Sequence, residues 1–165
     1  MTDFWNADEA FPAAPAHPLL QCLEAALIPL QGVLNRWRWY EDEEAGNAFE
    51  VGLYLKFEPD GETLRILLSE TLDACVYDVL VGQAPYQAGA LLRLLEQNHD
   101  KEWKWRAVPE DARSVLVFLE AYLPLEVGLR DPATRVWEGV RVALEGRGLL
   151  DTLWRDVPRP DAIEA

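Results

Sequence analysis

The pattern that most constrains the fold is an alternation of apolar and polar residues on either side of a short turn. Apolar residues occupy every second position of residues 49–57, which gives a strand one apolar face. The turn Pro59-Asp60-Gly61 follows, where proline fixes φ and glycine accepts positive φ. Residues 63–69 repeat the alternation, so the two runs predict an antiparallel hairpin. The apolar positions are Phe49, Val51, Leu53, Leu55 and Phe57, then Leu64, Ile66 and Leu68.

A helix and a short strand are predicted before this hairpin. Leu20, Leu23 and Leu27 recur at helical spacing after Pro18, a residue type that is tolerated at the first helical position. Pro29 ends or kinks this helix because it cannot donate the helical hydrogen bond. Residues 36–40 then alternate with a period of two and predict a strand.

Further elements are predicted after the hairpin. Residues 74–81 are apolar on both faces, as in a central or doubly covered strand, and Gly82 to Pro85 is expected to end it. A helix is predicted over residues 86–98, and two strands over residues 103–108 and 113–119. The buried stripe of this helix is predicted to comprise Leu91, Leu94 and Leu95.

The last predicted helix has a clear start, with Asp131 as N-cap and Pro132 at the first position. Gly146 and Gly148 are expected to interrupt it before residues 149–154 resume. Its predicted apolar stripe comprises Val136, Trp137, Val140, Ala143 and Leu144.

The order is therefore helix, three or four strands, helix, two strands, helix. This order predicts an α+β fold with an antiparallel sheet flanked by helices, α-β-β-β-(β)-α-β-β-α. Residues 17–156 are predicted to form one domain, between a flexible leader (1–16) and an acidic tail (157–165). Within the leader, Phe4, Trp5 and Phe11 are candidates to dock on the domain or on a partner.

The net charge of −14 argues against direct binding to nucleic acid or to an anionic membrane. A basic protein partner is the natural electrostatic complement, and the alternative is that the charge only keeps the protein soluble. No secretory signal is predicted at the N-terminus, and no apolar run approaches the ~20 residues of a membrane span, so we expect a cytoplasmic protein. Cys22 and Cys75 are predicted to be buried free thiols.

The sequence offers little for catalysis. A histidine-assisted nucleophile needs a well-placed imidazole, and the candidates are only His17, in the leader region, and His99, at a helix end. The run Glu41, Asp42, Glu43, Glu44 contains oxygen ligands for a hard cation, but it lacks the calcium-loop pattern and favours a solvated acidic loop. We therefore expect no cofactor, no metal and no enzymatic activity.

Two Trp-x-Trp segments remain to be explained. Trp37 and Trp39, like Trp103 and Trp105, alternate with basic residues, which superficially suggests a platform for stacking nucleic-acid bases. A protein of this charge would need a segregated basic face for that role, and only these short stretches are basic. The favoured interpretation is that the indoles face the helices. The alternative is that Trp37 and Trp39 anchor a protein partner.

Residues 113–119 suggest a second surface. Val115, Val117 and Leu119 alternate with Leu116 and Phe118, so both faces of this strand carry apolar side chains. Helices would cover one face, and a partner or a second subunit would cover the other. Intramolecular burial of both faces is the alternative. The predicted partner-binding residues are Trp37, Trp39, Leu116, Phe118, Glu41, Asp42, Glu43 and Glu44.

The order of these elements and several local features resemble the YbjN family, whose fold is similar to that of type III secretion chaperones. The matching pieces lie between Pro18 and Asp156: the opening helix before Gly32, the hairpin, the strand that runs into Ala84-Pro85, residues 91–98, two further strands and the long last helix. The resemblance implies a commonly dimeric α+β domain that binds another protein and has no known catalytic residues. It carries no site residue over to this chain.

These observations predict a noncatalytic chaperone-like or adaptor protein with a basic client, such as a DNA- or RNA-binding protein. Acidic surroundings would steer that client toward an apolar face. The first alternative is a small enzyme with a carboxylate or metal site that no motif reveals. The second is a single-strand nucleic-acid binder that uses the Trp-x-Trp segments.

Overall fold

We describe the fold from a computed structural model, which defines residues 9–41, 50–57 and 63–155. The elements, in chain order, are α1 (Pro18–Leu27), the 3₁₀ helix η1 (Ile28–Gly32), β1 (Leu34–Glu41), β2 (Glu50–Phe57), β3 (Thr63–Ser69), β4 (Ala74–Pro85), α2 (Ala88–Leu95), the 3₁₀ helix η3 (Glu96–Asn98), β5 (Trp103–Pro109), β6 (Ser114–Pro124), α3 (Leu125–Gly128) and α4 (Pro132–Leu153).

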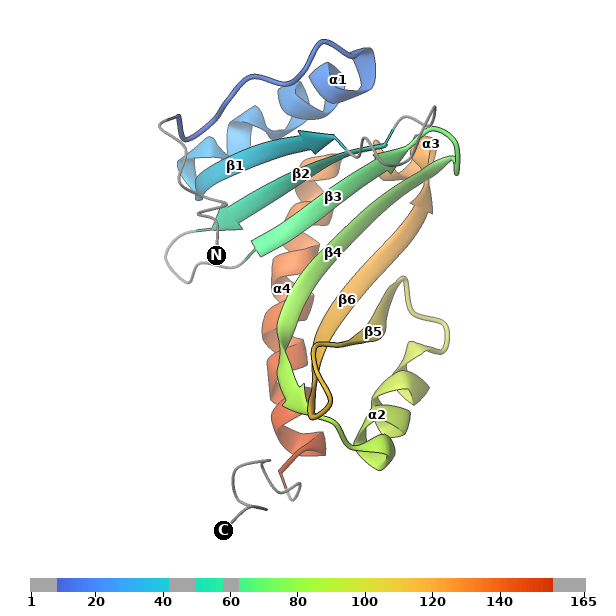
Figure 1. Cartoon of the computed structure of the whole chain (residues 1–165). Coiled ribbons are helices and arrows are strands. Elements are labelled where there is room, and N and C mark those ends of the chain that lie inside the picture. The colour runs from blue at the N-terminus through green and yellow to red at the C-terminus, as the bar shows by residue number, and fades with distance from the viewer. Residues whose placement is uncertain (1–8, 42–49, 58–62, 156–165) are drawn as a thin grey trace. The chain divides into compact units, whose positions relative to one another are not determined.

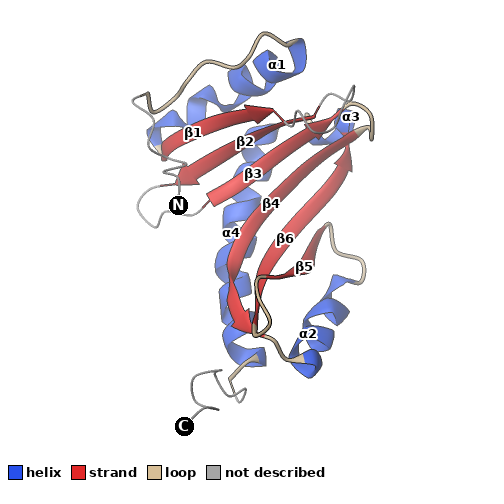
Figure 2. Cartoon of the chain, viewed as in Figure 1, coloured by secondary structure: helices blue, strands red, loops and turns tan. Residues whose placement is uncertain are grey.

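Across these ranges the strands form a six-stranded antiparallel sheet with the neighbour order β1-β2-β3-β4-β6-β5 (Figures 1 and 2). The predicted α+β class and the β2–β3 hairpin are confirmed, and four strands precede α2. α3 was not predicted, because a four-residue helix is too short to show a period of 3.6.

The chain divides into two compact units. Unit 1 comprises residues 1–77 and 122–138, and unit 2 comprises residues 78–121 and 139–165. Three elements, β4, β6 and α4, begin in one unit and end in the other. The single domain that the sequence predicts over residues 17–156 stays a prediction.

In unit 1, the register places apolar side chains opposite one another on one sheet face. Trp37 on β1 pairs with Leu55 on β2, and Leu55 pairs with Leu64 on β3. α1 lies alongside β1 (Figure 1) and begins at Pro18 as predicted. The buried side chains of this face and of α1 are Trp37, Leu53, Leu55, Phe57, Leu64, Ile66 and Leu68, with Leu20, Leu23 and Leu27.

Residues 9–16 contact β1 and α1, so this part of the predicted flexible leader is docked. The carbonyl oxygen of Ala10 accepts a hydrogen bond from the backbone N–H of Trp37 at 2.9 Å, and Glu24 accepts one from the N–H of Ala14 at 2.8 Å. The ring of Phe11 packs edge-on against the indole of Trp37. Phe4, Trp5 and the predicted acidic tail lie outside the described residues.

In unit 2, Trp103 and Trp105 on β5 are buried together with Val115, Val117 and Leu119 on β6. The prediction that Gly146 and Gly148 interrupt the last helix is wrong, because α4 is continuous to Leu153. A Cβ atom on Gly146 would lie 2.6 Å from Cη2 of Trp105, so glycine is needed for close packing rather than for a break.

One further predicted boundary is wrong, and the two predicted helix stripes are only partly correct. β4 continues through Gly82 to Pro85, where Gly82 lies close to Leu150 of α4. In the α2 stripe Leu94 is buried, Leu91 is half-buried and Leu95 is exposed. In the predicted α4 stripe Trp137 and Leu144 are exposed, whereas Val136 and Ala143 are buried.

The two cysteines also differ from each other. Cys75 is buried as predicted, but Cys22 is exposed. The helical period places Leu20 and Leu23 of α1 toward the core, which turns Cys22 outward.

Candidate binding surfaces

The predicted partner-binding residues of β1 are held within the chain. Trp37 is 2% exposed and Trp39 is half-buried. Both indole N–H groups donate to the carbonyl oxygen of Pro12, at 2.9 and 3.0 Å. The interpretation that the indoles pack inward is thus confirmed for Trp37. Its indole N–H is already bonded to Pro12 of the leader. Glu41 is the last residue of β1, whereas Asp42, Glu43 and Glu44 lie outside the described residues.

Leu116 and Phe118 lie on the β6 face opposite Val115, Val117 and Leu119, as predicted. Both are half-buried. The guanidinium of Arg106 lies over the Phe118 ring at 5.5 Å, and its Nε atom is 3.3 Å from the carboxylate of Glu120. This pair partly covers the apolar strip, and the role of Leu116 and Phe118 in binding a client or a second subunit stays a prediction.

A more exposed surface lies at the β3–β4 turn of unit 1. Leu72 is 62% exposed and Tyr122 is 59% exposed. The N–H of Leu125, the first residue of α3 directly after β6, donates to the carbonyl oxygen of Asp73 in this turn at 3.1 Å. Three extended residues span at most about 10 Å, so Tyr122 lies near the turn. We call this surface the acidic end; it consists of Glu70, Leu72, Asp73, Tyr122 and Glu126.

The turn has a local reason for displaying Leu72. The Ser69 hydroxyl accepts a hydrogen bond from the N–H of Leu72 at 3.2 Å, and the carbonyl of Glu70 accepts one from Asp73. Asp73 adopts a φ of 49°, a left-handed conformation that aspartate tolerates better than most residues. The turn is therefore fixed by its own polar groups, and Leu72 is left pointing away from the core.

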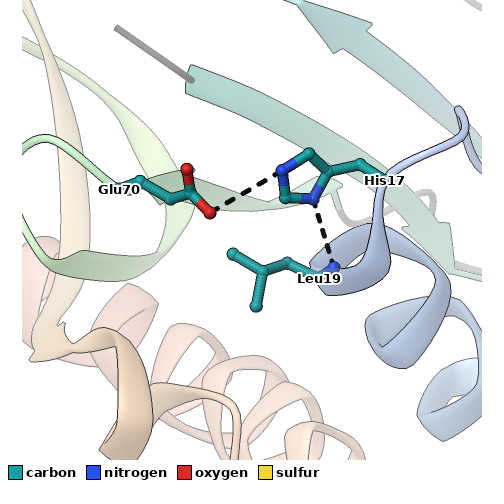
Figure 3. A network of polar contacts seen from close by, with 3 residues as sticks. All are labelled: His17, Leu19 and Glu70. Atoms are coloured by element: carbon teal, nitrogen blue, oxygen red, sulfur yellow. Dashed lines mark hydrogen bonds and ion pairs between the residues drawn. The ribbon is translucent and has the colours of Figure 1, made fainter.

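His17, a catalytic candidate from the sequence, is a structural residue in this part of the chain (Figure 3). Its Nδ1 atom accepts a hydrogen bond from the N–H of Leu19 at 3.2 Å, which makes it the N-cap of α1. Its Nε2 atom is 3.6 Å from a carboxylate oxygen of Glu70. His17 thus connects the start of α1 with the acidic end, and His99 pairs with the neighbouring Asp100.

Cys75 is not a reactive nucleophile at neutral pH. Burial raises the pKa of its thiol to about 12, despite a hydrogen bond with Tyr77 and the charge of Arg135, which both lower that pKa. Burial also raises the pKa of Tyr77, whose hydroxyl donates to the carbonyl oxygen of Gly128 at 2.6 Å. The protonated thiol is a poor nucleophile and a poor metal ligand.

Unit 2 contains an open cavity of about 820 Å³ between β4, the β5–β6 turn and the end of α4. Ser114 lines it, and its hydroxyl donates to the Asp111 carboxylate at 3.1 Å. The backbone N–H of Arg113, with Ser114, lowers the pKa of Asp111, which therefore stays charged. The cavity lining contains no histidine or cysteine that could activate Ser114. The residues that line it are Val81, Gly82, Gln83, Ala84, Pro85, Asp111, Arg113, Ser114, Arg147, Leu150, Asp151, Trp154 and Arg155.

The described residues offer neither a metal-binding cluster nor a membrane-spanning helix. The described ranges contain no group of three or more His, Cys, Asp or Glu side chains that could hold a metal ion. None of the helices described for this chain combines the length and the apolar composition needed to cross a membrane.

The charge is unevenly divided between the units. By residue range, unit 1 holds 17 of the 29 acidic and 6 of the 15 basic residues, a net charge of −11. Unit 2 holds the other 12 and 9, a net charge of −3. The acidity that the composition reveals therefore belongs mainly to unit 1, which also carries the acidic end.

Comparisons with protein-family models, with curated proteins and with solved structures gave no match to this chain.

Proposed function

We propose that this protein binds a basic protein client without catalysing a reaction, as a chaperone-like or adaptor protein. We also propose that its fold resembles that of the YbjN family and of type III secretion chaperones. In line with that resemblance, the protein would form a homodimer. The antiparallel sheet and the order of helices and strands support the α+β part of this expectation. A DNA- or RNA-binding protein would be a client of suitable charge.

The observation that carries the proposal is the acidic end. It combines two exposed apolar side chains, Leu72 and Tyr122, with the carboxylates of Glu70, Asp73 and Glu126. Arg130 pairs with Glu126 at 3.3 Å and offsets part of this charge, yet both side chains are largely exposed. Exposed ion pairs of this kind contribute at most about 1 kcal/mol, so a basic client can exchange partners with Glu126.

In this proposal the apolar side chains and the carboxylates of the acidic end contribute differently to binding. Burying a side chain the size of leucine contributes about 1.5–3 kcal/mol, so Leu72 and Tyr122 would supply affinity. The surrounding carboxylates and the −11 charge of unit 1 would speed the encounter with a basic client and reject acidic ones. Binding is therefore expected to weaken as the salt concentration rises.

The test uses a double variant and a matched control. Leu72→Ser with Tyr122→Ser removes the apolar part of the acidic end. Leu92→Ser with Tyr86→Ser is the control, because Leu92 and Tyr86 are equally exposed, at 62% and 60%, but lie in unit 2. Aggregation of a chemically unfolded basic protein, followed by light scattering, reports client binding. An unfolded acidic protein serves as a negative client.

We expect the wild type and the Leu92/Tyr86 control to suppress aggregation of the basic protein, and the Leu72/Tyr122 variant to lose most of this activity. Lysate capture with the same three baits would then identify a client that only the Leu72/Tyr122 variant fails to hold. Equal suppression by both variants would contradict the assignment of the acidic end. Equal suppression of basic and acidic proteins would contradict the electrostatic part of the proposal.

A further inference from the structure

A short part of the leader, residues 10–14, crosses the two indoles of β1, and we call it the strap. The carbonyl oxygen of Pro12 accepts hydrogen bonds from both indole N–H groups, that of Trp37 at 2.9 Å and that of Trp39 at 3.0 Å. The ring of Phe11 packs edge-on against the indole of Trp37, with 5.0 Å between the ring centroids. The two indoles therefore contact one aromatic ring and the carbonyl of one proline.

The strap lies on the surface of unit 1 rather than in its core. None of its residues is buried: Ala10 and Ala13 are exposed, and Phe11, Pro12 and Ala14 are half-buried. The helix that follows differs, because α1 buries three leucines. The strap is thus held in the way that a peptide is held on a protein surface, and its departure uncovers the indoles without removing a core side chain.

The contact with the indoles has the chemistry of proline recognition. Proline has no N–H group that would need a partner at the site, and its fixed φ means that less conformational entropy is lost on binding. Aromatic-lined grooves bind extended proline-containing segments for these reasons. Two indole donors on one carbonyl also use both of its lone pairs. The pair Trp37 and Trp39 therefore suits a segment in which an aromatic residue precedes proline.

The strap occupies this site as an internal ligand. A tether as short as residues 15–17 gives an effective concentration on the order of millimolar, so contacts of low intrinsic affinity are enough to keep the strap in place. A separate segment that makes the same contacts and binds more tightly than this limit displaces it. The strap then blocks the site against weak ligands and yields it to strong ones.

We propose that Trp37 and Trp39 form a binding site for a segment of another protein in which an aromatic residue precedes proline. The proline carbonyl of that segment replaces the carbonyl of Pro12 on both indoles, and its aromatic ring replaces Phe11. The partner binds indole side chains and does not add a strand to β1. The site shares no residue with the acidic end, so this inference is independent of the client proposal.

The strap of a second copy of this chain is a less suitable source of the segment. The N–H of His17 donates to the carbonyl oxygen of Pro15 at 2.8 Å, which closes a tight turn between the strap and its own α1. The N–H of Ala14 donates to Glu24 of the same helix at 2.8 Å. Both bonds hold the strap beside the helix that it precedes.

The test uses the full chain and a labelled synthetic peptide with the sequence of residues 9–17. Phe11→Ser loosens the strap but leaves both indoles intact. Adding Trp39→Phe to Phe11→Ser removes one indole N–H from the site. Adding Trp137→Phe instead is the matched control, because Trp137 is an exposed indole of α4 in unit 1. Circular dichroism and thermal unfolding confirm that each variant is folded.

Fluorescence anisotropy measures the binding of the peptide. We expect the Phe11→Ser variant to bind it about tenfold more tightly than the wild type, because its own strap competes less for the site. Adding Trp39→Phe should weaken binding by about two- to tenfold, the value of one hydrogen bond, whereas adding Trp137→Phe should leave it unchanged. Peptides that carry Phe11→Ser or Pro12→Ala should bind more weakly than the original peptide.

Four results would overturn the proposal. The first is no binding to the Phe11→Ser variant up to about 1 mM peptide, which would make the strap a fixed part of the fold. The second is an equal effect of Trp39→Phe and Trp137→Phe. The third is equal binding of the Pro12→Ala peptide, which would show that the site does not select proline. The fourth is self-association of the wild type that Phe11→Ser abolishes in sedimentation, which would assign the site to a second copy.

Discussion

Gly146 and Gly148 lie two residues apart in α4, but their surroundings in unit 2 differ. A Cβ atom at Gly146 would lie 2.6 Å from Cη2 of Trp105 and 3.3 Å from Cδ1 of Leu119. A Cβ atom at Gly148 would meet no heavy atom within 4 Å. One glycine is therefore set by packing against the indole, and the other only lowers the helix propensity.

Gly146→Ala should accordingly lower the free energy of unfolding by about 1–3 kcal/mol, the usual cost of overpacking. Gly148→Ala should raise it by about 0.5–1 kcal/mol, because alanine loses less backbone entropy in a helix. Urea denaturation of both variants measures the difference. Equal effects of the two substitutions would show that Trp105 does not pack against α4 as described.

At the scale of elements, one residue on each edge strand of the sheet has its backbone bonded to a group that is not a strand. On β1, Ala10 accepts the backbone N–H of Trp37. On β5, the side-chain amide of Asn98 donates to the carbonyl of Trp105 at 3.0 Å and accepts its N–H at 2.6 Å. Such caps oppose pairing with a strand of another molecule. A client or a second subunit is thus expected to bind side chains rather than these edge positions.

Asn98→Ala removes both hydrogen bonds to Trp105. At about 0.5–1.5 kcal/mol for each bond, we expect the free energy of unfolding to fall by about 1–3 kcal/mol, with more self-association at high concentration. Gln97→Ala is the control, because its exposed amide makes only a 3.3 Å bond to Arg93. Denaturation and sedimentation measure the two effects. If Asn98→Ala behaves like Gln97→Ala, the amide does not protect the edge.

The elements themselves were largely predictable, because the period of two in residues 49–57 and 63–69 does not depend on distant contacts. Boundaries were less predictable. β4 passes through Gly82 to Pro85 because the chain stays paired beyond them, as the bond from the Tyr86 N–H to Arg113 shows. The acidic end was not predictable. The exposure of Leu72 depends on the geometry of the β3–β4 turn, which the period of two does not encode.

At the scale of the whole molecule, charge affects stability as well as binding. A folded chain with a net charge of −14 brings like charges closer together than the unfolded chain does. We expect this repulsion to be greatest in unit 1, because its sequence contains 17 acidic and only 6 basic residues. Salt shortens the Debye length from about 30 Å at 0.01 M to about 10 Å at 0.1 M, and so it should relieve the repulsion.

We therefore expect the free energy of unfolding at pH 7 to rise as sodium chloride is added over this low range. The same titration near the sequence pI of 4.4 is the control, because the net charge there approaches zero and the rise should vanish. Urea denaturation at each salt concentration measures the effect. A rise of the same size at both pH values would mean that general salt effects on hydration, rather than charge repulsion, stabilise the fold. A fall at pH 7 would mean that attractive pairs such as Arg106–Glu120 outweigh the repulsion among the excess carboxylates.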